Sequence, residues 1–184
     1  GLLCLTGCRL GAVAAAALAG DTPRAVRAAG KLGDIFGRDR VWVEVQRHWL
    51  PDDAALTAGL VAAARGAGLP LVATNDVHYA TAEGHRLRDV LTATRYNCTL
   101  TELGAQLPAG LADAQASTEF RLKSAAELAA LFADLPEAVT ATQSIAERCA
   151  VALDFSSRRT PAFPPQTAEF PAGLPPGETA FSYL

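Results

Sequence analysis

The stretch that decides the fold is LPLVATNDVH, residues 69–78. Its first five residues are apolar apart from the proline and follow a glycine, which is typical of a short buried strand. Asp76 and His78 follow, and in an extended backbone residues two apart point to the same face. Polar groups at the carboxyl end of a buried parallel strand are a common position for a metal or catalytic site. Alternatively, Asp76 caps a turn and His78 is a solvated rim residue.

The chain up to about residue 98 alternates strands with helices. We expect strands at residues 1–6, 41–46 and 69–74, and helices at residues 11–19, 22–36, 52–65 and 82–95. Short parallel strands joined by helices predict a parallel sheet or an α/β barrel. The fold class predicted is therefore α/β.

Beyond residue 98 the pattern changes to helices and then to a connector. Ser124 and Glu127 have the spacing of a capping box, which predicts a helix over residues 124–132. Pro136 opens a second predicted helix that reaches about residue 150. From residue 154 the chain is rich in proline and glycine, and we expect an extended connector there.

Composition limits the class of protein. Of the 184 residues, 50% are hydrophobic, and the net charge is -3, so a globular fold is expected and a main DNA-gripping surface is not. The four cysteines lack metal-ribbon spacing, which favours a reducing cytoplasm over a disulfide framework. No apolar run is long enough to span a membrane. Because the chain starts at Gly1 and contains no methionine, we expect an internal piece of a longer protein.

Two further places bear candidate ligands. Cys8 follows the first predicted strand and would lie at the same rim as Asp76 and His78, although a lone cysteine is more often a buried small hydrophobe. On the middle strand, Glu44 and His48 share a face and could reach the same pocket. Their simpler interpretation, a polar face or loop, is the one we favour.

Three strings resemble the PHP (polymerase and histidinol phosphatase) domain of bacterial C-family DNA polymerases, the group of the DNA polymerase III alpha subunit. They are LTGC at 5–8, VWVEVQRH at 41–48 and LPLVATNDVHY at 69–79. The closing string PGETAFSYL, residues 176–184, resembles the lead-in to the polymerase core. Residues 8–9 and 41–44 look more like the error-prone branch than the replicative one.

The resemblance implies a partial PHP-type (β/α) barrel with parallel strands. It assigns residues 1–98 to the C-terminal half of the PHP domain, 99–152 to a helical segment and 153–184 to the connector into a polymerase core beyond Leu184. Family metal ligands at the strand ends map onto Cys8, Asp76 and His78, with the remaining ligands upstream of Gly1. The resemblance places no catalytic or cofactor-binding residue of nucleotidyl transfer in this chain.

The resemblance also implies a parent enzyme. This would be an error-prone DNA-directed DNA polymerase in replication and damage-induced translesion synthesis, with DNA, deoxynucleoside triphosphates and mutagenesis accessory proteins as partners. A Cys/Asp/His set suits zinc or manganese, whereas magnesium would serve the polymerase core. A free-standing PHP phosphoesterase and a non-catalytic PHP scaffold remain the alternatives. We expect the segment alone to be inactive and to fold poorly, because a barrel without its early strands has open edges.

Overall fold

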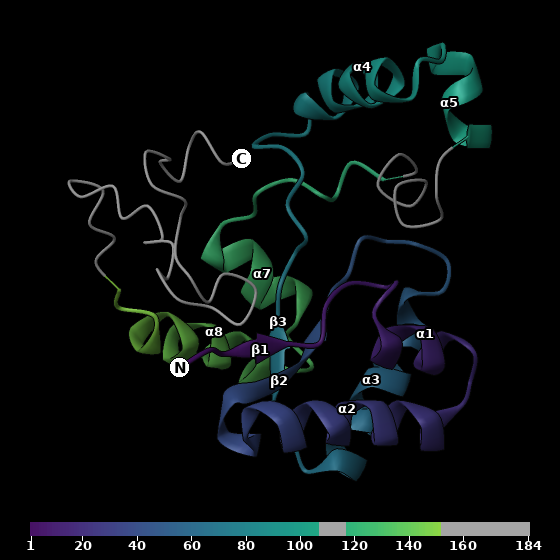
Figure 1. The fold of residues 1–184 in the computed structure, drawn as a ribbon. Coiled ribbons are helices and arrows are strands. Elements are labelled where there is room, and N and C mark those ends of the chain that lie inside the picture. The colour runs from purple at the N-terminus through teal and green to yellow at the C-terminus, as the bar shows by residue number, and fades with distance from the viewer. Residues whose placement is uncertain (107–116, 152–184) are drawn as a thin grey trace, which may run out of the picture. The chain divides into compact units, whose positions relative to one another are not determined.

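Three short parallel strands carry the fold. In the computed structural model, which describes residues 1–106 and 117–151, β1 (Cys4–Leu5), β2 (Val41–Val45) and β3 (Leu71–Ala73) form one sheet in that order. Cys4 pairs with Val41 and Val45 pairs with Ala73, both in parallel. The predicted parallel α/β arrangement is confirmed (Figure 1), while closure into a PHP barrel stays a prediction.

Helices form both crossovers. α1 (Ala12–Leu18), α2 (Thr22–Phe36) and the 3₁₀ turn η1 (Arg38–Arg40) connect β1 to β2, and α3 (Asp53–Ala67) connects β2 to β3. The side chain of Asp21 accepts a hydrogen bond from the Arg24 amide and so caps α2. Gly68 closes α3 in the left-handed conformation that favours glycine. These local signals explain why the predicted helices agree with the structure.

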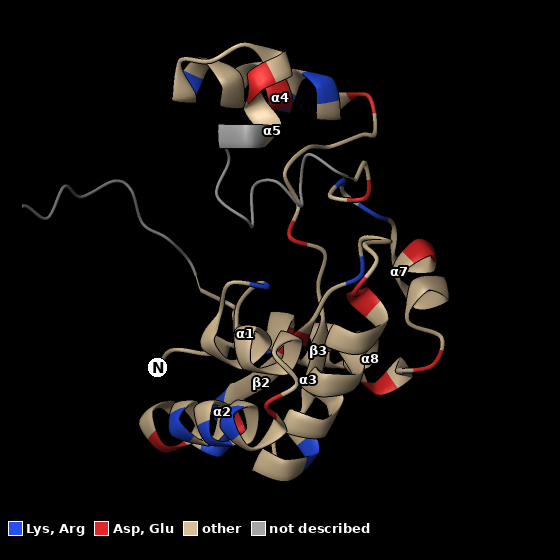
Figure 2. Cartoon of the chain, turned by 90° about the vertical axis from the view of Figure 1, so that its right-hand side faces the viewer, with Lys and Arg blue, Asp and Glu red and all other residues tan. Residues whose placement is uncertain are grey.

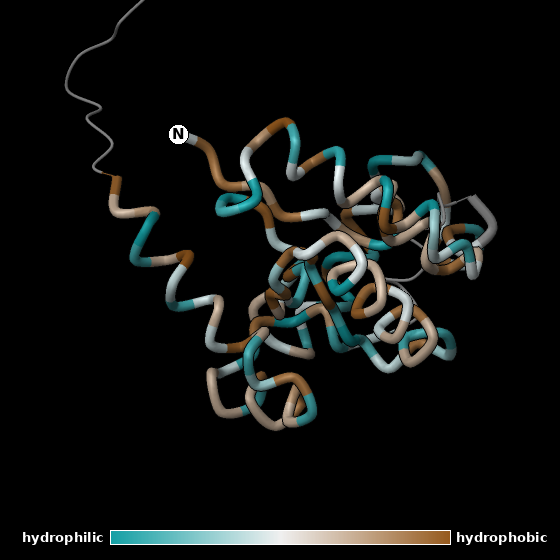
Figure 3. Tube along the Cα trace, turned by 90° about the horizontal axis from the view of Figure 1, so that it is seen from below, coloured by the Kyte–Doolittle hydropathy of each residue, from teal (hydrophilic) through white to brown (hydrophobic). Residues whose placement is uncertain are grey.

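Small residues bring the helices close together. A Cβ atom added at Gly59 of α3 would lie 2.8 Å from the Cβ of Ala17 in α1, and one added at Gly66 would lie 2.6 Å from Val26 of α2. The core between these helices and β2 is accordingly rich in buried alanine and valine. Figure 3 shows hydrophobic and hydrophilic residues interspersed along the helices, as expected for elements with one covered face.

Among the described residues, four more helices follow the sheet. They are α4 (Gly84–Tyr96), α5 (Leu100–Gln106), α7 (Ala125–Leu131) and α8 (Pro136–Arg148). α4 packs on α5, and α8 packs against β3. The capping box of Ser124 and Glu127 is present as predicted, whereas α5 was not predicted. None of the helices in the described part of the chain is long and apolar enough to cross a membrane.

The chain divides into two compact units, residues Gly1–Cys149 and Ala150–Leu184. The predicted connector, residues 153–184, lies outside the described residues. The domain boundary predicted near residue 98 stays a prediction.

Basic residues recur along α2, where Arg24, Arg27 and Lys31 are all exposed (Figure 2).

Candidate metal centre

The loops that leave the three strands are joined by one carboxylate. Glu44 lies near the carboxyl end of β2, and its Oε2 accepts a hydrogen bond from the amide of Gly7, 3.0 Å away and two residues after β1. Its Oε1 accepts bonds from the Thr74 hydroxyl (2.5 Å) and from Gln46 Nε2 (3.0 Å). The Glu44 amide donates to the Thr6 hydroxyl at 2.9 Å. The predicted polar face on β2 is therefore a network that spans the ends of all three strands.

Asp76 and His78 meet in the loop after β3. Their Oδ2 and Nε2 atoms lie 3.6 Å apart, and both side chains are partly exposed. The extended geometry assumed for this pair is wrong, because β3 ends at Ala73 and Asp76 has a φ of 41° in the left-handed region. A turn, rather than strand alternation, brings the two side chains together.

Cys8 lies half-buried in the loop after β1, and the loop is fixed on both sides. Gly7 before it has a φ of 83°, a conformation that side chains rarely adopt, and donates to Glu44. Arg9 after it pairs with Asp52 and Asp53 at the start of α3, with Nη1 2.9 Å from Asp53 Oδ1. The residues on both sides of Cys8 are therefore held, one by Glu44 of β2 and the other by the start of α3.

The three predicted ligands do not converge into one group. Within residues 1–106 and 117–151, no group of three or more His, Cys, Asp or Glu side chains lies close enough to hold a metal ion. Asp76 and His78 are brought together, and Cys8 is not part of a group with them. Their joint role as ligands stays a prediction.

His48, the other candidate predicted on the middle strand, lies three residues beyond the end of β2 and is buried. Its ring stacks on Phe120 with centroids 3.6 Å apart and planes 6° from parallel. Nε2 lies 3.0 Å from the Asn75 carbonyl and must be its donor, because a carbonyl only accepts. Burial lowers the pKa of His48, so the neutral ring is favoured. Its Nδ1 atom has no hydrogen-bond partner among the described residues.

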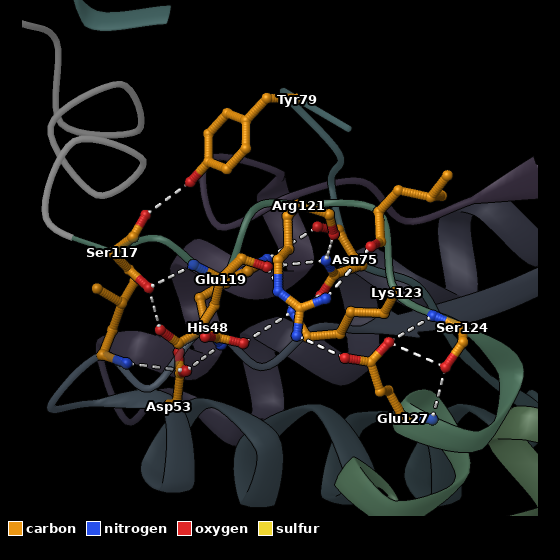
Figure 4. Close-up of polar contacts among 12 residues, drawn as sticks. His48, Asp53, Asn75, Tyr79, Ser117, Glu119, Arg121, Lys123, Ser124 and Glu127 are labelled. Carbon is orange, nitrogen blue, oxygen red and sulfur yellow. Dashed lines mark hydrogen bonds and ion pairs between the residues drawn. The ribbon is translucent and has the colours of Figure 1, made fainter. Parts of the chain in front are cut away.

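Residues 117–123 contact the loop that follows β3 and hold Asn75 and His78 in place. Asn75 is buried, and its Nδ2 donates to the carbonyls of Glu119 (2.9 Å) and Arg121 (2.6 Å). The His78 amide donates to the Phe120 carbonyl at 2.8 Å. Figure 4 shows the contacts of Asn75 with Glu119 and Arg121, which join two parts of the chain that lie more than forty residues apart in sequence. No local pattern signals such a pairing, so sequence reasoning missed it.

Lys123, a buried cation, adds further contacts between Asn75 and the 117–123 segment. Lys123 Nζ lies 3.0 Å from the Glu119 carboxylate and 3.2 Å from Asn75 Oδ1, and it also donates to the Glu119 carbonyl (Figure 4). These three acceptors match the three donors of an ammonium group. Lys123 therefore connects Glu119 with Asn75 and is not a free anion-binding group.

A cavity of about 710 Å³ lies elsewhere, along α3 and the turn between α7 and α8. Its lining is mainly apolar, with Trp49, Val61 and Leu135 among its residues, and it includes none of Cys8, Asp76 and His78. We place the candidate centre at the strand ends, because the converging polar side chains lie there.

Comparisons with known proteins find relatives that are named as DNA polymerases. No family model matches the sequence. It is 39% identical over 166 residues to an error-prone DNA polymerase of Nocardia farcinica, which covers 86% of this chain and 14% of the relative. It is 37% identical over 164 residues to the DNA polymerase III subunit alpha of Caulobacter vibrioides, covering 89% of this chain and 14% of the relative. The chain is homologous to one segment of the C-family DNA polymerases.

This homology extends across both branches of the polymerases. An error-prone DNA polymerase of Mycolicibacterium paratuberculosis is 36% identical over 181 residues, which is 98% of this chain and 15% of the relative. The chain thus spans about one seventh of the length of the polymerases it matches. The resemblance noted from the three strings is confirmed at the level of these C-family polymerases.

Proposed function

We propose that this chain is the C-terminal half of the PHP domain, with its following connector, of an error-prone DNA-directed DNA polymerase. The parent would extend primers with deoxynucleoside triphosphates during replication and translesion synthesis in the cytoplasm, with accessory mutagenesis proteins as partners. Homology over most of the chain to polymerases of this name supports the proposal. The error-prone branch rests on the sequence details at residues 8–9 and 41–44.

We further propose that the strand ends contribute part of a divalent-metal site. The observation that supports it is the convergence of Asp76 and His78, whose oxygen and nitrogen lie 3.6 Å apart. With the Cys8 sulfur these donors fit zinc or manganese. Such an ion, when bound, would activate water and clamp phosphoryl oxygens for phosphoester hydrolysis, or act structurally. Magnesium would belong to the polymerase core, outside this chain.

The role of this chain would be to supply metal ligands and to hold them in position. Asp76 and His78 would supply two ligands from one loop, and the fixed Cys8 loop would supply a third. The His78 amide is held by the Phe120 carbonyl, which limits the positions that its ring can take. The chain therefore contributes a positioned half-site.

Metal analysis of the intact protein tests this proposal. We expect Asp76→Ala and His78→Ala each to reduce bound zinc or manganese, measured by elemental mass spectrometry after dialysis. His85→Ala is the matched control, because His85 Nδ1 also lies close to an aspartate, 3.8 Å from Asp89 Oδ2, but on α4. Equal metal content in all variants and the wild type would contradict a metal role and favour the scaffold.

The free-standing phosphoesterase is distinguished by a different measurement. Primer extension by the intact protein, in the presence of magnesium, is expected to persist in Asp76→Ala, because nucleotidyl transfer is assigned to residues outside this chain. A protein that hydrolyses phosphoesters but extends no primer would refute the polymerase assignment.

A further inference from the structure

Glu44 occupies a position that no other carboxylate in the described residues shares. It lies in the middle strand, one residue before the strand ends, and its carboxylate contacts the loops on both sides. One of those loops carries Cys8, and the other carries Asp76 and His78. The two loops belong to strands that do not pair with each other, since β2 lies between them.

The residues that bond to Glu44 lie close in sequence to the candidate ligands. Gly7, whose amide donates to Glu44 Oε2 at 3.0 Å, directly precedes Cys8. Thr74, whose hydroxyl donates to Oε1, lies two residues before Asp76. A change at either contact would therefore act on the backbone within two residues of a candidate ligand.

Both carboxylate oxygens are already used. Oε1 accepts from Thr74 and from Gln46, and Oε2 accepts from Gly7. Three of the roughly four lone-pair sites of the carboxylate therefore accept hydrogen bonds, and these bonds hold the side chain in the network. Bonds from neutral donors to an ionised acceptor are also stronger than those between neutral groups.

We infer that Glu44 is a positioning residue that holds the Cys8 loop and the Asp76–His78 loop at a fixed separation for a divalent metal. The inference rests on the metal site proposed above. Groups that orient metal ligands from outside the coordination sphere typically change metal affinity about 10- to 100-fold when they are mutated. Glutamine at position 44 keeps the shape of the side chain but replaces one acceptor oxygen with an NH₂ group, which is a donor. In one orientation this group faces Gln46 Nε2, and in the other it faces the Gly7 amide, both of which are also donors.

The test compares Glu44→Gln with the wild type in the intact protein. The first readout is zinc affinity, measured by competition with a chromophoric chelator, and we expect it to fall about 10-fold or more. The second readout is the rate at which Cys8 is alkylated in metal-free protein. It is measured by peptide mass spectrometry in a Cys4→Ser background. We expect this rate to change several-fold, because the Gly7 anchor next to Cys8 is weakened.

Glu102→Gln is the matched control. Glu102 is also a carboxylate bound by a backbone amide and a side chain, both of Thr99, but it lies on α5, and we expect neither readout to change. Unchanged affinity and unchanged alkylation in Glu44→Gln would overturn the inference. Lower affinity with unchanged alkylation would also overturn it, because that result indicates a direct ligand.

The two proposals fail in different ways. A wild-type protein that binds no zinc through Asp76 and His78 refutes the metal site. The alkylation rate then still decides the role of Glu44: a changed rate supports positioning of the Cys8 loop, and an unchanged rate overturns it.

Discussion

Replacing Asp53 with asparagine should loosen the Cys8 loop from α3. Asp53 is buried, and its Oδ1 lies 2.9 Å from Arg9 Nη1. Its Oδ2 accepts bonds from the amides of His48 (2.6 Å) and Leu50 (3.1 Å). Asparagine has the same shape but offers one acceptor oxygen and no charge. If the remaining oxygen keeps its bonds from the backbone amides of His48 and Leu50, the side-chain NH₂ group of asparagine faces the Arg9 guanidinium, and both groups are donors.

The size of the effect follows from what Arg9 retains. Breaking a buried ion pair by removing one partner costs about 3–5 kcal/mol. Arg9 keeps its pair with Asp52, which reduces the expected loss to about 2–3 kcal/mol. At 1.4 kcal/mol per factor of ten, local opening would become about 30- to 140-fold more frequent. Hydrogen exchange of the intact protein, read in peptides covering residues 4–10 and 46–54, measures this opening directly.

Asp52→Asn is the matched control, because Asp52 pairs with the same arginine but its side chain is 48% exposed. Exposed pairs contribute about 0–1 kcal/mol, so exchange should accelerate less than about fivefold. If Asp53→Asn accelerates exchange no more than Asp52→Asn does, the reasoning that Asp53 anchors the Cys8 loop is refuted.

Two other predictions concern packing and pH. Gly59→Ala places a Cβ 2.8 Å from that of Ala17, and overpacking of about 1–3 kcal/mol should exceed the gain in helix propensity of up to about 1 kcal/mol, so hydrogen-exchange protection of α3 should fall. Gly30→Ala is the control, because its Cβ would meet nothing within 4 Å and should not lower the protection of α2. Equal effects of the two substitutions would contradict the close approach of α1 and α3. Arg121, then the amide and hydroxyl of Ser124, lower the pKa of Glu127 from 4.5 to about 2. Because the folded pKa is the lower one, this stabilisation of the start of α7 is present above about pH 4.5 and is lost as the pH falls toward about 2. Amide exchange of α7, corrected for intrinsic rates, should show that loss in the wild type but not in Glu127→Gln.

Elements with strong local signals were predictable from the sequence. The alternation of 41–46 matches β2, Asp21 caps α2, and Gly68 ends α3 as expected. α5 was missed although Thr99 and Glu102 bond reciprocally at its start, with the Thr99 amide 2.9 Å from Glu102 Oε2. That Thr-x-x-Glu spacing is a capping-box signal that could have revealed the helix.

The candidate site was only partly predictable. The sequence placed Asp76 and His78 together, but it did so from an extended backbone that the structure does not have. It could not show that Glu44 joins the strand ends or that Asn75 is held by Glu119 and Arg121, because these contacts join segments 30 or more residues apart. Long-range contacts of this kind depend on the whole fold rather than on local propensity.

The backbone at Asp76 ties these observations together. A left-handed residue other than glycine costs of order 1 kcal/mol or more, and it persists only where its surroundings hold it. Here the chain is held on both sides of Asp76: Asn75, directly before it, bonds to two carbonyls of the 117–123 segment, and the amide of His78, two residues after it, bonds to the Phe120 carbonyl. The same contacts that hold the turn also bring the Asp76 and His78 side chains together. The half-site therefore depends on the 117–123 segment as much as on β3, and a fragment that ended near residue 98 would contain both candidate ligands without the contacts that position them.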